Sequence, residues 1–232
     1  DNRQSLHFAQ FFKVLELMGY PWAGECKHID FGLMKCADGV MSTRQGKVIF
    51  LDELLDKAVA SVADIIDEKN PNLANKGHIA EQVGVGAVMF SNLFHDRTQD
   101  FTFSWKDALN FQGESGPYIQ YTYARIQSIM RKVKQDAQPN YALLADPKEQ
   151  ILIDSLYQYP EQVKEAARTY KPSVIAKYLI SVCQRFNEFY THCPVIKADD
   201  AVRNARIGLL VAVAQVINNG MSLLGIQLPD QM

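Results

Sequence analysis

The chain has 232 residues, of which 47% are hydrophobic and 22% charged, and its formal net charge is −2. This composition excludes a disordered or fibrous chain and argues against a protein that binds polyanions over its whole surface. No stretch approaches the roughly 18 uninterrupted apolar residues of a membrane-spanning helix, so no membrane partner is expected. The length allows one large or two small domains.

The first residues of the chain and the spacing of its cysteines indicate the cellular compartment of the protein. The first residues lack the basic and apolar segments of a signal peptide and do not begin with Met, which indicates a piece of a longer protein. Four scattered cysteines without a Cys-x-x-Cys pair favour free thiols and a cytoplasmic location. Cys26, His28 and Cys36 lie close together, but their spacing fits no zinc pattern and a fourth ligand is missing, so no metal site is predicted.

The first half of the chain, residues 1–116, mixes helical and extended patterns. Its expected elements are a helix with a broad buried face over 6–18, a strand over 28–34, a loop over 36–46, a short strand over 48–51, helices over 52–68 and 77–94, and a strand over 101–105. Gly84 and Gly86 inside the last of these helices indicate close packing against a neighbour. Gly113 and Gly116-Pro117 then mark the predicted domain boundary.

From residue 117 to residue 232 the apolar periodicity is helical throughout. The predicted helices cover 118–135, 147–158, 160–170, 172–192 and 199–219, with short connections between them. Asn219-Gly220 is expected to end the last long helix through a residue in the left-handed conformation. The pattern predicts an antiparallel helical bundle of about five helices that follows an incomplete α/β portion.

One helix of the second half carries aromatic and basic residues together. Residues 1–116 hold 11 Lys+Arg and 16 Asp+Glu, whereas residues 117–232 hold 13 and 10. Tyr118, Tyr121, Tyr123 and Arg125 lie within the helix that begins at Tyr118, and Arg131 follows them. Exposed aromatic rings next to cations suit stacking on unpaired bases together with phosphate contacts. Packing along one helical face is the alternative.

A small polar loop, residues 40–47, stands between two predicted strands. It offers backbone N–H groups, two hydroxyls and two cations, which can hold a triphosphate while charge moves during phosphoryl or adenylyl transfer. A solvated turn is the alternative. The sequence contains no nucleophile elbow, no phosphate loop with the Gly-x-x-x-x-Gly-Lys pattern and no His-Glu-x-x-His zinc helix.

Taken in order, several segments resemble one family. They are Asp1–Gln10, then His28–Met34 followed by Met41–Gly46, then Asp100–Trp105, Ser115–Arg125, the Asp-Ala-Val-Arg run Asp200–Arg203, and the ending Leu224–Met232. Together they resemble the C-terminal half of a bacterial-type class I arginyl-tRNA synthetase. The implied fold is an α/β remnant of a class I synthetase catalytic domain over 1–116, followed by an all-α helical bundle, the DALR anticodon-binding domain, over 117–232.

The resemblance also implies a function and a set of site residues. The family attaches arginine to its tRNA through an arginyl-adenylate, with ATP as substrate and Mg²⁺ expected in the full-length enzyme, without a further protein-bound metal. Its implied partners are therefore arginine tRNA, ATP and L-arginine, and not DNA. Gln4 matches a position that recognises the arginine side chain. The implied triphosphate loop consists of Met41, Ser42, Thr43, Arg44, Gln45 and Gly46. The implied tRNA contacts are Tyr118, Tyr121, Tyr123, Arg125 and Met232.

Two departures from the class I pattern qualify this resemblance. The general loop reads Lys-Met-Ser-Lys-Ser, whereas Val40–Arg44 reads Val-Met-Ser-Thr-Arg, so Arg44 and Lys47 are candidates to replace the second lysine. The His-Ile-Gly-His signature is absent, and the chain alone is therefore expected not to activate arginine. Two alternatives remain: a non-catalytic helical RNA-binding adaptor, and another class I synthetase with the same helical module, such as the cysteine enzyme.

Overall fold

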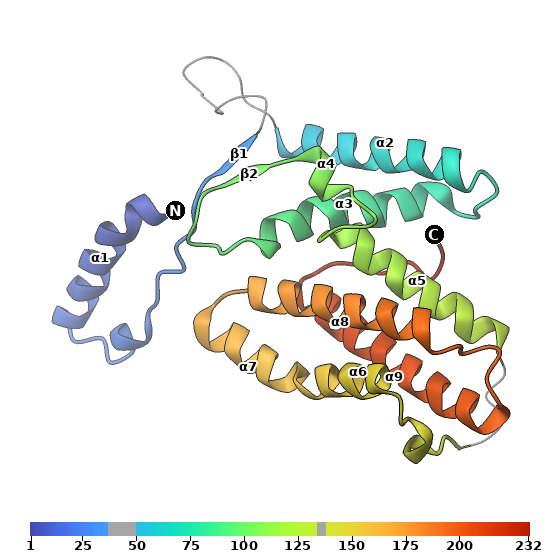
Figure 1. The fold of residues 1–232 in the computed structure, drawn as a ribbon. Coiled ribbons are helices and arrows are strands. Elements are labelled where there is room, and N and C mark those ends of the chain that lie inside the picture. The colour runs from blue at the N-terminus through green and yellow to red at the C-terminus, as the bar shows by residue number, and fades with distance from the viewer. Residues whose placement is uncertain (37–49, 134–137) are drawn as a thin grey trace.

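The computed structural model describes residues 1–36, 50–133 and 138–232, and within them the chain is mostly helical with one small parallel sheet (Figure 1). The helices are α1 (Ser5–Leu17), α2 (Leu51–Lys69), α3 (Lys76–Phe94), α4 (Trp105–Ala108), α5 (Gly116–Lys132), α6 (Pro147–Tyr157), α7 (Tyr159–Thr169), α8 (Ser173–His192) and α9 (Asp200–Leu223), and the strands are β1 (Met34–Cys36) and β2 (Phe101–Phe103). Short 3-10 helices cover Asn2–Gln4, Ala23–Glu25 and Tyr141–Leu143. The predicted class, an α/β portion followed by a helical bundle, is confirmed.

The sheet is smaller than the sequence predicts. β1 and β2 pair in parallel, with Met34 opposite Phe101. The predicted strand over 28–34 is wrong except for Met34, because residues 30–33 are held by a loop instead of a neighbouring strand. Gly32 N–H donates to the Arg97 carbonyl at 2.7 Å, and Leu33 N–H donates to the Asp100 carboxylate at 2.8 Å.

Strand β2 ends earlier than predicted, and the segment between β1 and α2 lies mostly outside the described residues. The prediction of a strand over 101–105 is wrong at its end, because the Ser104 hydroxyl accepts a hydrogen bond from Asp107 N–H and starts α4 at Trp105. The predicted loop over 36–46 and strand over 48–51 fall almost entirely outside the described residues. Leu51, which was expected to end that strand, begins α2.

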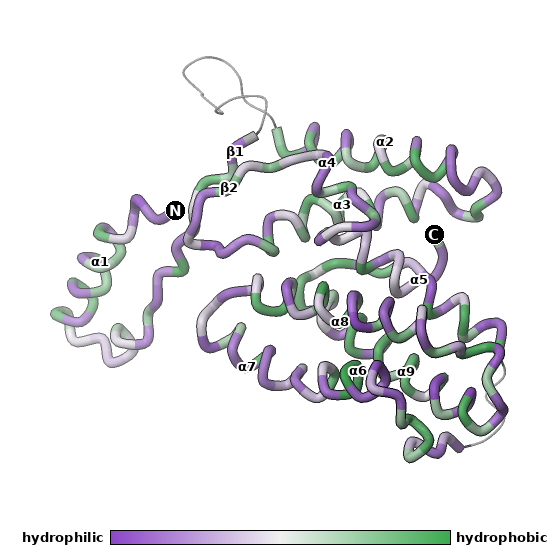
Figure 2. The backbone as a smooth tube through the Cα atoms, in the orientation of Figure 1, coloured by the Kyte–Doolittle hydropathy of each residue, from purple (hydrophilic) through white to green (hydrophobic). Residues whose placement is uncertain are grey.

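Helix α1 forms where predicted but does not bury the expected face. It contains no buried residue, and Leu6 and Leu17 are 71% and 76% exposed. Figure 1 shows α1 standing apart from the other helices, and Figure 2 shows hydrophobic residues along it. Within the described residues α1 is covered only in part, for example by His28, whose ring stacks on Phe8. The predicted buried face of this helix is therefore wrong, because most of its apolar side chains are open to solvent.

Helices α2 and α3 form an antiparallel pair that packs closely. Leu54, Ala58, Val62 and Ile66 share the buried face of α2. A Cβ placed on Gly84 of α3 would lie 2.7 Å from the Val59 backbone nitrogen, so only glycine permits this approach. The predicted role of this glycine in close helix packing is confirmed.

Helices α5 to α9 form the bundle, whose largest buried side chains include Ile119, Leu152, Leu179, Phe186 and Leu210. The same hydrophobic cluster includes Phe90 of α3, so packing continues across residue 116. The backbones also approach there, because a Cβ on Gly116 would lie 2.9 Å from the Gly86 carbonyl oxygen. The domain boundary before residue 117 remains a prediction.

The last helix runs past its predicted end. α9 continues through Gly220 to Leu223, and the residue with a left-handed conformation is Gly225, with φ of 73°. Gly220 instead permits close packing, since a Cβ there would lie 2.7 Å from Leu179 Cδ2. By length and composition α9 could cross a membrane, but half of its apolar window is buried in the bundle, as in a core helix.

A buried ion pair joins the beginnings of α6 and α9. The Arg206 Nε atom lies 2.6 Å from Oε1 of Glu149, whose side chain is fully buried. The other Glu149 oxygen accepts from the Asp146 N–H at 2.9 Å, completing a capping box at the start of α6. Because both charges are paired and hydrogen-bonded, this contact specifies how the two helices meet.

Candidate nucleic-acid interface

Helix α5 presents the aromatic and basic side chains that the sequence singled out. The Ser115 hydroxyl caps the helix by accepting from the Tyr118 N–H at 3.2 Å, and Pro117 fits its first turn. This start sets the rotation of the helix. Tyr121 and Arg125, four residues apart, then lie on one exposed face.

A cavity of about 470 Å³ opens beside this face of α5. It lies between α5, the turn that joins α2 to α3, the end of α8 and the C-terminal residues. Its lining comprises Asn70, Leu73, Tyr121, Ala124, Arg125, Ser128, Ile129, Arg131, Lys132, Tyr190, Gln231 and Met232. The volume falls within the ~300–1,000 Å³ of ordinary small-molecule sites.

Tyr121 and Arg125 form one unit at the edge of this cavity. The Arg125 guanidinium lies 4.9 Å from the centre of the Tyr121 ring, and Nη2 donates to the Tyr121 hydroxyl at 3.2 Å. Tyr121 is 40% exposed, so one side of the pair remains open to solvent. A ring stacked under a guanidinium offers both a flat apolar face and a positive charge.

Tyr118 supports this pair from inside. The Arg125 Nη1 atom donates to Asn187 Oδ1 at 3.1 Å, and Asn187 Nδ2 donates to the Tyr118 hydroxyl at 2.8 Å. Burial raises the pKa of Tyr118, and the hydrogen bond from Asn187 opposes that rise. The phenol therefore stays neutral, and it fixes the orientation of Asn187 and, through it, of Arg125.

The C-terminal residues reach the cavity because a buried amide holds them. The Gln120 side chain is fully buried, and its Nε2 donates to the carbonyls of Gln82 at 3.1 Å and Gln227 at 2.8 Å. The tail is thereby held between α3 and α5. It ends at Met232, which packs against the buried cluster of α2 and α3.

Positive charge is concentrated at the end of α5. Arg125, Arg131 and Lys132 all line the cavity, and the Arg131 Nη1 atom donates to the Asp230 carbonyl at 3.2 Å. Cations at this end also interact favourably with the negative end of the helix dipole. The site thus combines aromatic faces, amide groups and cations, the set that an unpaired base with its phosphate requires.

The structure separates the residues that the sequence grouped together. Tyr121, Arg125 and Met232 line the cavity, whereas Tyr118 lies behind it and Tyr123 packs against the hydrophobic core. Tyr123 points away from Tyr121 because residues two apart in a helix face different directions. Tyr118 lies in the first turn of α5, where its hydroxyl is bonded to Asn187. The loop Met41–Gly46 lies outside the described residues.

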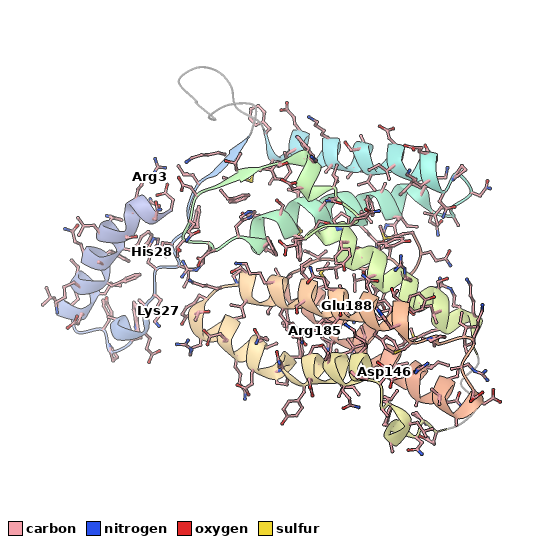
Figure 3. The ribbon with its side chains drawn as sticks, viewed as in Figure 1. Arg3, Lys27, His28, Asp146, Arg185 and Glu188 are labelled. Carbon is pink, nitrogen blue, oxygen red and sulfur yellow. The ribbon has the colours of Figure 1, made fainter. Side chains whose placement is uncertain are left out.

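Gln4 lies far from the cavity, in the N-terminal region. Its side chain accepts a hydrogen bond from the Asp1 nitrogen at 3.1 Å, and this bond forms a capping box together with the Asp1 carboxylate, which accepts from the backbone of the first turn. His28 stacks on Phe8 with ring centres 4.3 Å apart and reaches the Asp1 carbonyl with Nε2 at 3.3 Å. Figure 3 shows Arg3 and His28 in this region, on the opposite side from the C-terminus.

Sequence reasoning missed the contributions of Asn187, Asn70, Leu73 and Gln231. Asn187 lies three residues before Tyr190 in α8, so helical spacing offered a signal for it. The others come from a turn and a tail, which carry no periodic pattern, and only tertiary packing brings them to α5.

A second cavity, of about 250 Å³, lies near the end of α3 and is lined by His95, Asp107 and Glu114 among other residues. It has no Lys or Arg in its lining, which makes it a poor partner for phosphate. Among the described residues no three His, Cys, Asp or Glu side chains gather into a metal-holding group.

Two families of protein domains match the chain, and together they cover most of its length. Residues 1–105 match the model of the class I tRNA synthetase (R) catalytic domain, and residues 119–232 match the DALR anticodon binding domain. The chain is 42% identical to an arginine–tRNA ligase of Halothermothrix orenii and 43% identical to one of Clostridium botulinum (strain Alaska E43), over 100% and 99% of its length. It superposes on the Thermus thermophilus arginyl-tRNA synthetase with a TM-score of 0.93 and 32% identity, covering 100% of this chain and 40% of that one.

The chain belongs to the arginyl-tRNA synthetase family and matches its C-terminal part. It spans 41% of the length of the curated relatives named above. A Plasmodium falciparum arginyl-tRNA synthetase shares the fold with a TM-score of 0.82 at 20% identity, covering 100% of this chain and 40% of that one. Because the first 105 residues match a catalytic domain, a purely non-catalytic adaptor is disfavoured. The alternative of the cysteine enzyme is disfavoured as well, because the matched relatives are arginine–tRNA ligases.

Proposed function

We propose that the helical bundle reads the anticodon loop of arginine tRNA through the cavity beside α5. The observation that supports this most is the convergence of Tyr121, Arg125 and Met232 with Arg131 and Lys132 around one cavity. These residues come from a helix and a tail that are distant in sequence. Anticodon bases are unpaired, so their faces and edges are free to be recognised.

Each group of the cavity has a separate task in this proposal. The open side of the Tyr121 ring stacks on a base, and the amides of Asn70 and Gln231 form hydrogen bonds to its edge. Arg131 and Lys132 bind the neighbouring phosphates. Stacking and phosphate contacts supply affinity, whereas the contacts with the edge of the base supply discrimination between sequences.

For the whole protein we propose ATP-dependent ligation of arginine to its tRNA in the cytoplasm. In this proposal Gln4 contributes to the arginine site, and Met41–Gly46 stabilise the triphosphate of ATP, which enters with Mg²⁺. Loop donors and cations that act only as charge develops lower the barrier more than they improve substrate binding. The chain lacks the His-Ile-Gly-His signature, and by itself it binds tRNA without forming arginyl-adenylate.

The test is binding of an arginine anticodon stem-loop to the 232-residue chain, with a second stem-loop that differs only in the anticodon. Tyr121→Ala is expected to weaken binding of the arginine stem-loop about 5- to 150-fold, since base stacking on an aromatic ring contributes ~1–3 kcal/mol. The matched control is Tyr157→Ala on α6, whose side chain is 87% exposed and lies outside the cavity.

A double substitution separates the phosphate contacts from base recognition. Arg131→Ala with Lys132→Ala is expected to weaken both stem-loops equally and to reduce the slope of log affinity against log salt, because fewer counterions are released. Equal loss with Tyr121→Ala and Tyr157→Ala would contradict the cavity as the binding site. Equal binding of the two stem-loops by the unmodified chain would contradict anticodon reading.

A further inference from the structure

A cluster of charged residues lies where the N-terminal arm, residues 1–33, meets the bundle. We call this cluster the junction; it consists of Lys27 and Asp30 of the arm, Asp96 and Arg97 of the loop after α3, and Tyr170 and Lys171 of the turn between α7 and α8. Figure 3 shows Lys27 at the side of the arm that faces this turn. No residue of the junction belongs to the cavity beside α5.

Arg97 is the centre of the junction because it contacts both neighbours at once. Its Nη1 atom donates to the Asp30 carboxylate at 2.6 Å and also to the Asp30 carbonyl. Its Nε atom donates to the Tyr170 carbonyl at 2.7 Å. The planar guanidinium holds its donors in a fixed geometry, so these bonds set the direction from Asp30 to Tyr170.

A second pair of contacts runs parallel to the first. Lys171 Nζ lies 2.7 Å from the Asp96 carboxylate, whose other oxygen accepts from the Thr98 N–H and hydroxyl at 3.1 and 2.9 Å. Lys27 Nζ lies 5.1 Å from the centre of the Tyr170 ring. Three contacts thus reach the bundle: Arg97 with the Tyr170 carbonyl and Asp96 with Lys171, both from the loop after α3, and the cation–π contact of Lys27 in the arm with the Tyr170 ring.

The backbone at Tyr170 is unusual. Tyr170 ends α7 in the left-handed conformation, with φ of 55°, which is uncommon for a bulky residue. Such a conformation persists where surrounding contacts hold it. Here the carbonyl and the ring are both engaged, by Arg97 and Lys27 respectively.

The arm has few other attachments among the described residues. α1 buries none of its residues. The arm is held to the loop after α3 at Gly32, whose N–H donates to the Arg97 carbonyl at 2.7 Å, and at Leu33, whose N–H donates to the Asp100 carboxylate at 2.8 Å. That loop is in turn held to the bundle by Arg97 and Asp96. The orientation of the arm therefore depends on the junction together with these backbone hydrogen bonds.

We propose that Arg97 is a positioning residue that fixes the orientation of the N-terminal arm relative to the helical bundle. The arm carries Gln4 and leads through β1 to residue 37, while the bundle carries the cavity beside α5. Arg97 thus sets the distance between the arginine and ATP end of the molecule and the anticodon end. This last consequence rests on the proposed function, whereas the orientation itself does not.

The experiment measures the distance between spin labels on the arm and on the bundle. Labels are attached to the 232-residue chain through Gln10→Cys on α1 and Ala167→Cys on α7, with Cys26→Ser and Cys36→Ser. The buried Cys183 and Cys193 stay unlabelled, because burial raises the pKa of these thiols to about 12 and about 11. Arg97→Met is expected to broaden the distance distribution and shift its mean at unchanged helix content.

The matched control is Arg168→Met, two residues before Tyr170. Arg168 pairs with Glu165 on the same helix at 2.8 Å, so the same charge is removed next to the junction without loss of a contact to the arm. This control is expected to leave the distribution narrow. Arg97→Lys retains the charge but not the planar geometry, and an intermediate width is expected; it also serves if Arg97→Met fails to fold.

Anticodon stem-loop binding separates this inference from the proposed function. Because the cavity lies at the other end of α8 from Lys171, Arg97→Met is expected to leave stem-loop affinity unchanged. A narrow, unshifted distribution in both Arg97 variants would overturn the positioning role whatever the RNA result. Failure of the unmodified chain to bind the stem-loop would overturn the proposed function and leave the distance measurement valid.

Discussion

The N-terminal arm and the helical bundle both contain a helix with an apolar stripe, but they bury that stripe to different extents. α1 and α9 both carry a broad apolar stripe, but α1 buries none of its 13 residues, whereas α9 of 24 residues packs Leu210, Val213 and Ile217 into a closed core. An apolar stripe identifies a surface that requires a partner. Whether the stripe stabilises the fold depends on which elements cover it.

The two regions also differ in how they are held. The bundle is stabilised by a continuous hydrophobic cluster, and polar contacts such as Arg206 with Glu149 specify its arrangement. The arm relies on backbone hydrogen bonds and on the charged junction around Arg97. Burial of apolar area contributes most to stability, so unfolding should begin at the arm.

The largest expected difference in stability between the two regions comes from truncating one leucine side chain in each. Leu210→Ala in α9 is expected to lower the free energy of unfolding by about 2–5 kcal/mol, because the side chain is fully buried and its removal leaves a cavity. Leu17→Ala in α1, at 76% exposure, should change it by no more than about 0.5 kcal/mol. Urea unfolding followed by circular dichroism measures both, and equal effects would contradict the contrast between the regions.

The next largest difference in stability between the two regions is expected when one glycine in each is replaced by alanine. Gly220→Ala is expected to cost about 1–3 kcal/mol, since the added methyl group would meet Leu179 at 2.7 Å. Gly24→Ala in the arm has no atom within 4 Å of the new Cβ and should be neutral or slightly stabilising. Thermal unfolding of the two variants tests this, and a stabilised Gly220→Ala would mean that α9 and α8 can separate without cost.

The smallest expected effect is the loss of stability when the Asp96 carboxylate at the junction is protonated. The hydrogen bond from Lys171, together with those from Thr98, lowers the pKa of Asp96 from 3.8 to about 2. A carboxylate with a lowered pKa stabilises the folded state above its unfolded pKa, and this contribution is lost as the pH falls from about 3.8 towards 2. The junction is therefore intact at neutral pH.

The measurement is the carboxyl carbon chemical shift of Asp96 as a function of pH. Lys171→Met is expected to raise the pKa of Asp96 while leaving it below 3.8, because the Thr98 hydrogen bonds remain. Lys164→Met, whose cation pairs with Glu161 on the surface of α7, should leave it unchanged. An identical pKa in all three proteins would show that Lys171 does not engage Asp96 in solution.

Local sequence signals predicted the helices well, and the exceptions have physical causes. The start of α6 was predicted correctly at Pro147, which fits the first turn of a helix, whereas α5 begins at Gly116, two residues before its predicted start, because Ser115 caps it. Gly220 was read as a helix end, yet it is a packing position. Glycine serves both purposes, and only the neighbouring Leu179 distinguishes them.

The candidate site was only partly predictable. The aromatic and basic residues of α5 were visible in the sequence, but their separation into Tyr121 at the cavity and Tyr123 in the core required the rotation of the helix. Asn70 and Gln231 could not be found, because no local rule connects a turn and a tail with a helix many residues away. The residues of the triphosphate loop rest on the family resemblance alone.

The sequence by itself determined the order of helices, the helical bundle and the family, since periodicity, caps and motifs are properties of short segments read in order. The tertiary structure decided which apolar faces are buried, where the C-terminal residues end and how Arg97 joins the arm to the bundle. These depend on contacts between segments that are far apart in the chain. Such contacts are selected by packing and charge pairing in three dimensions, which no local pattern encodes.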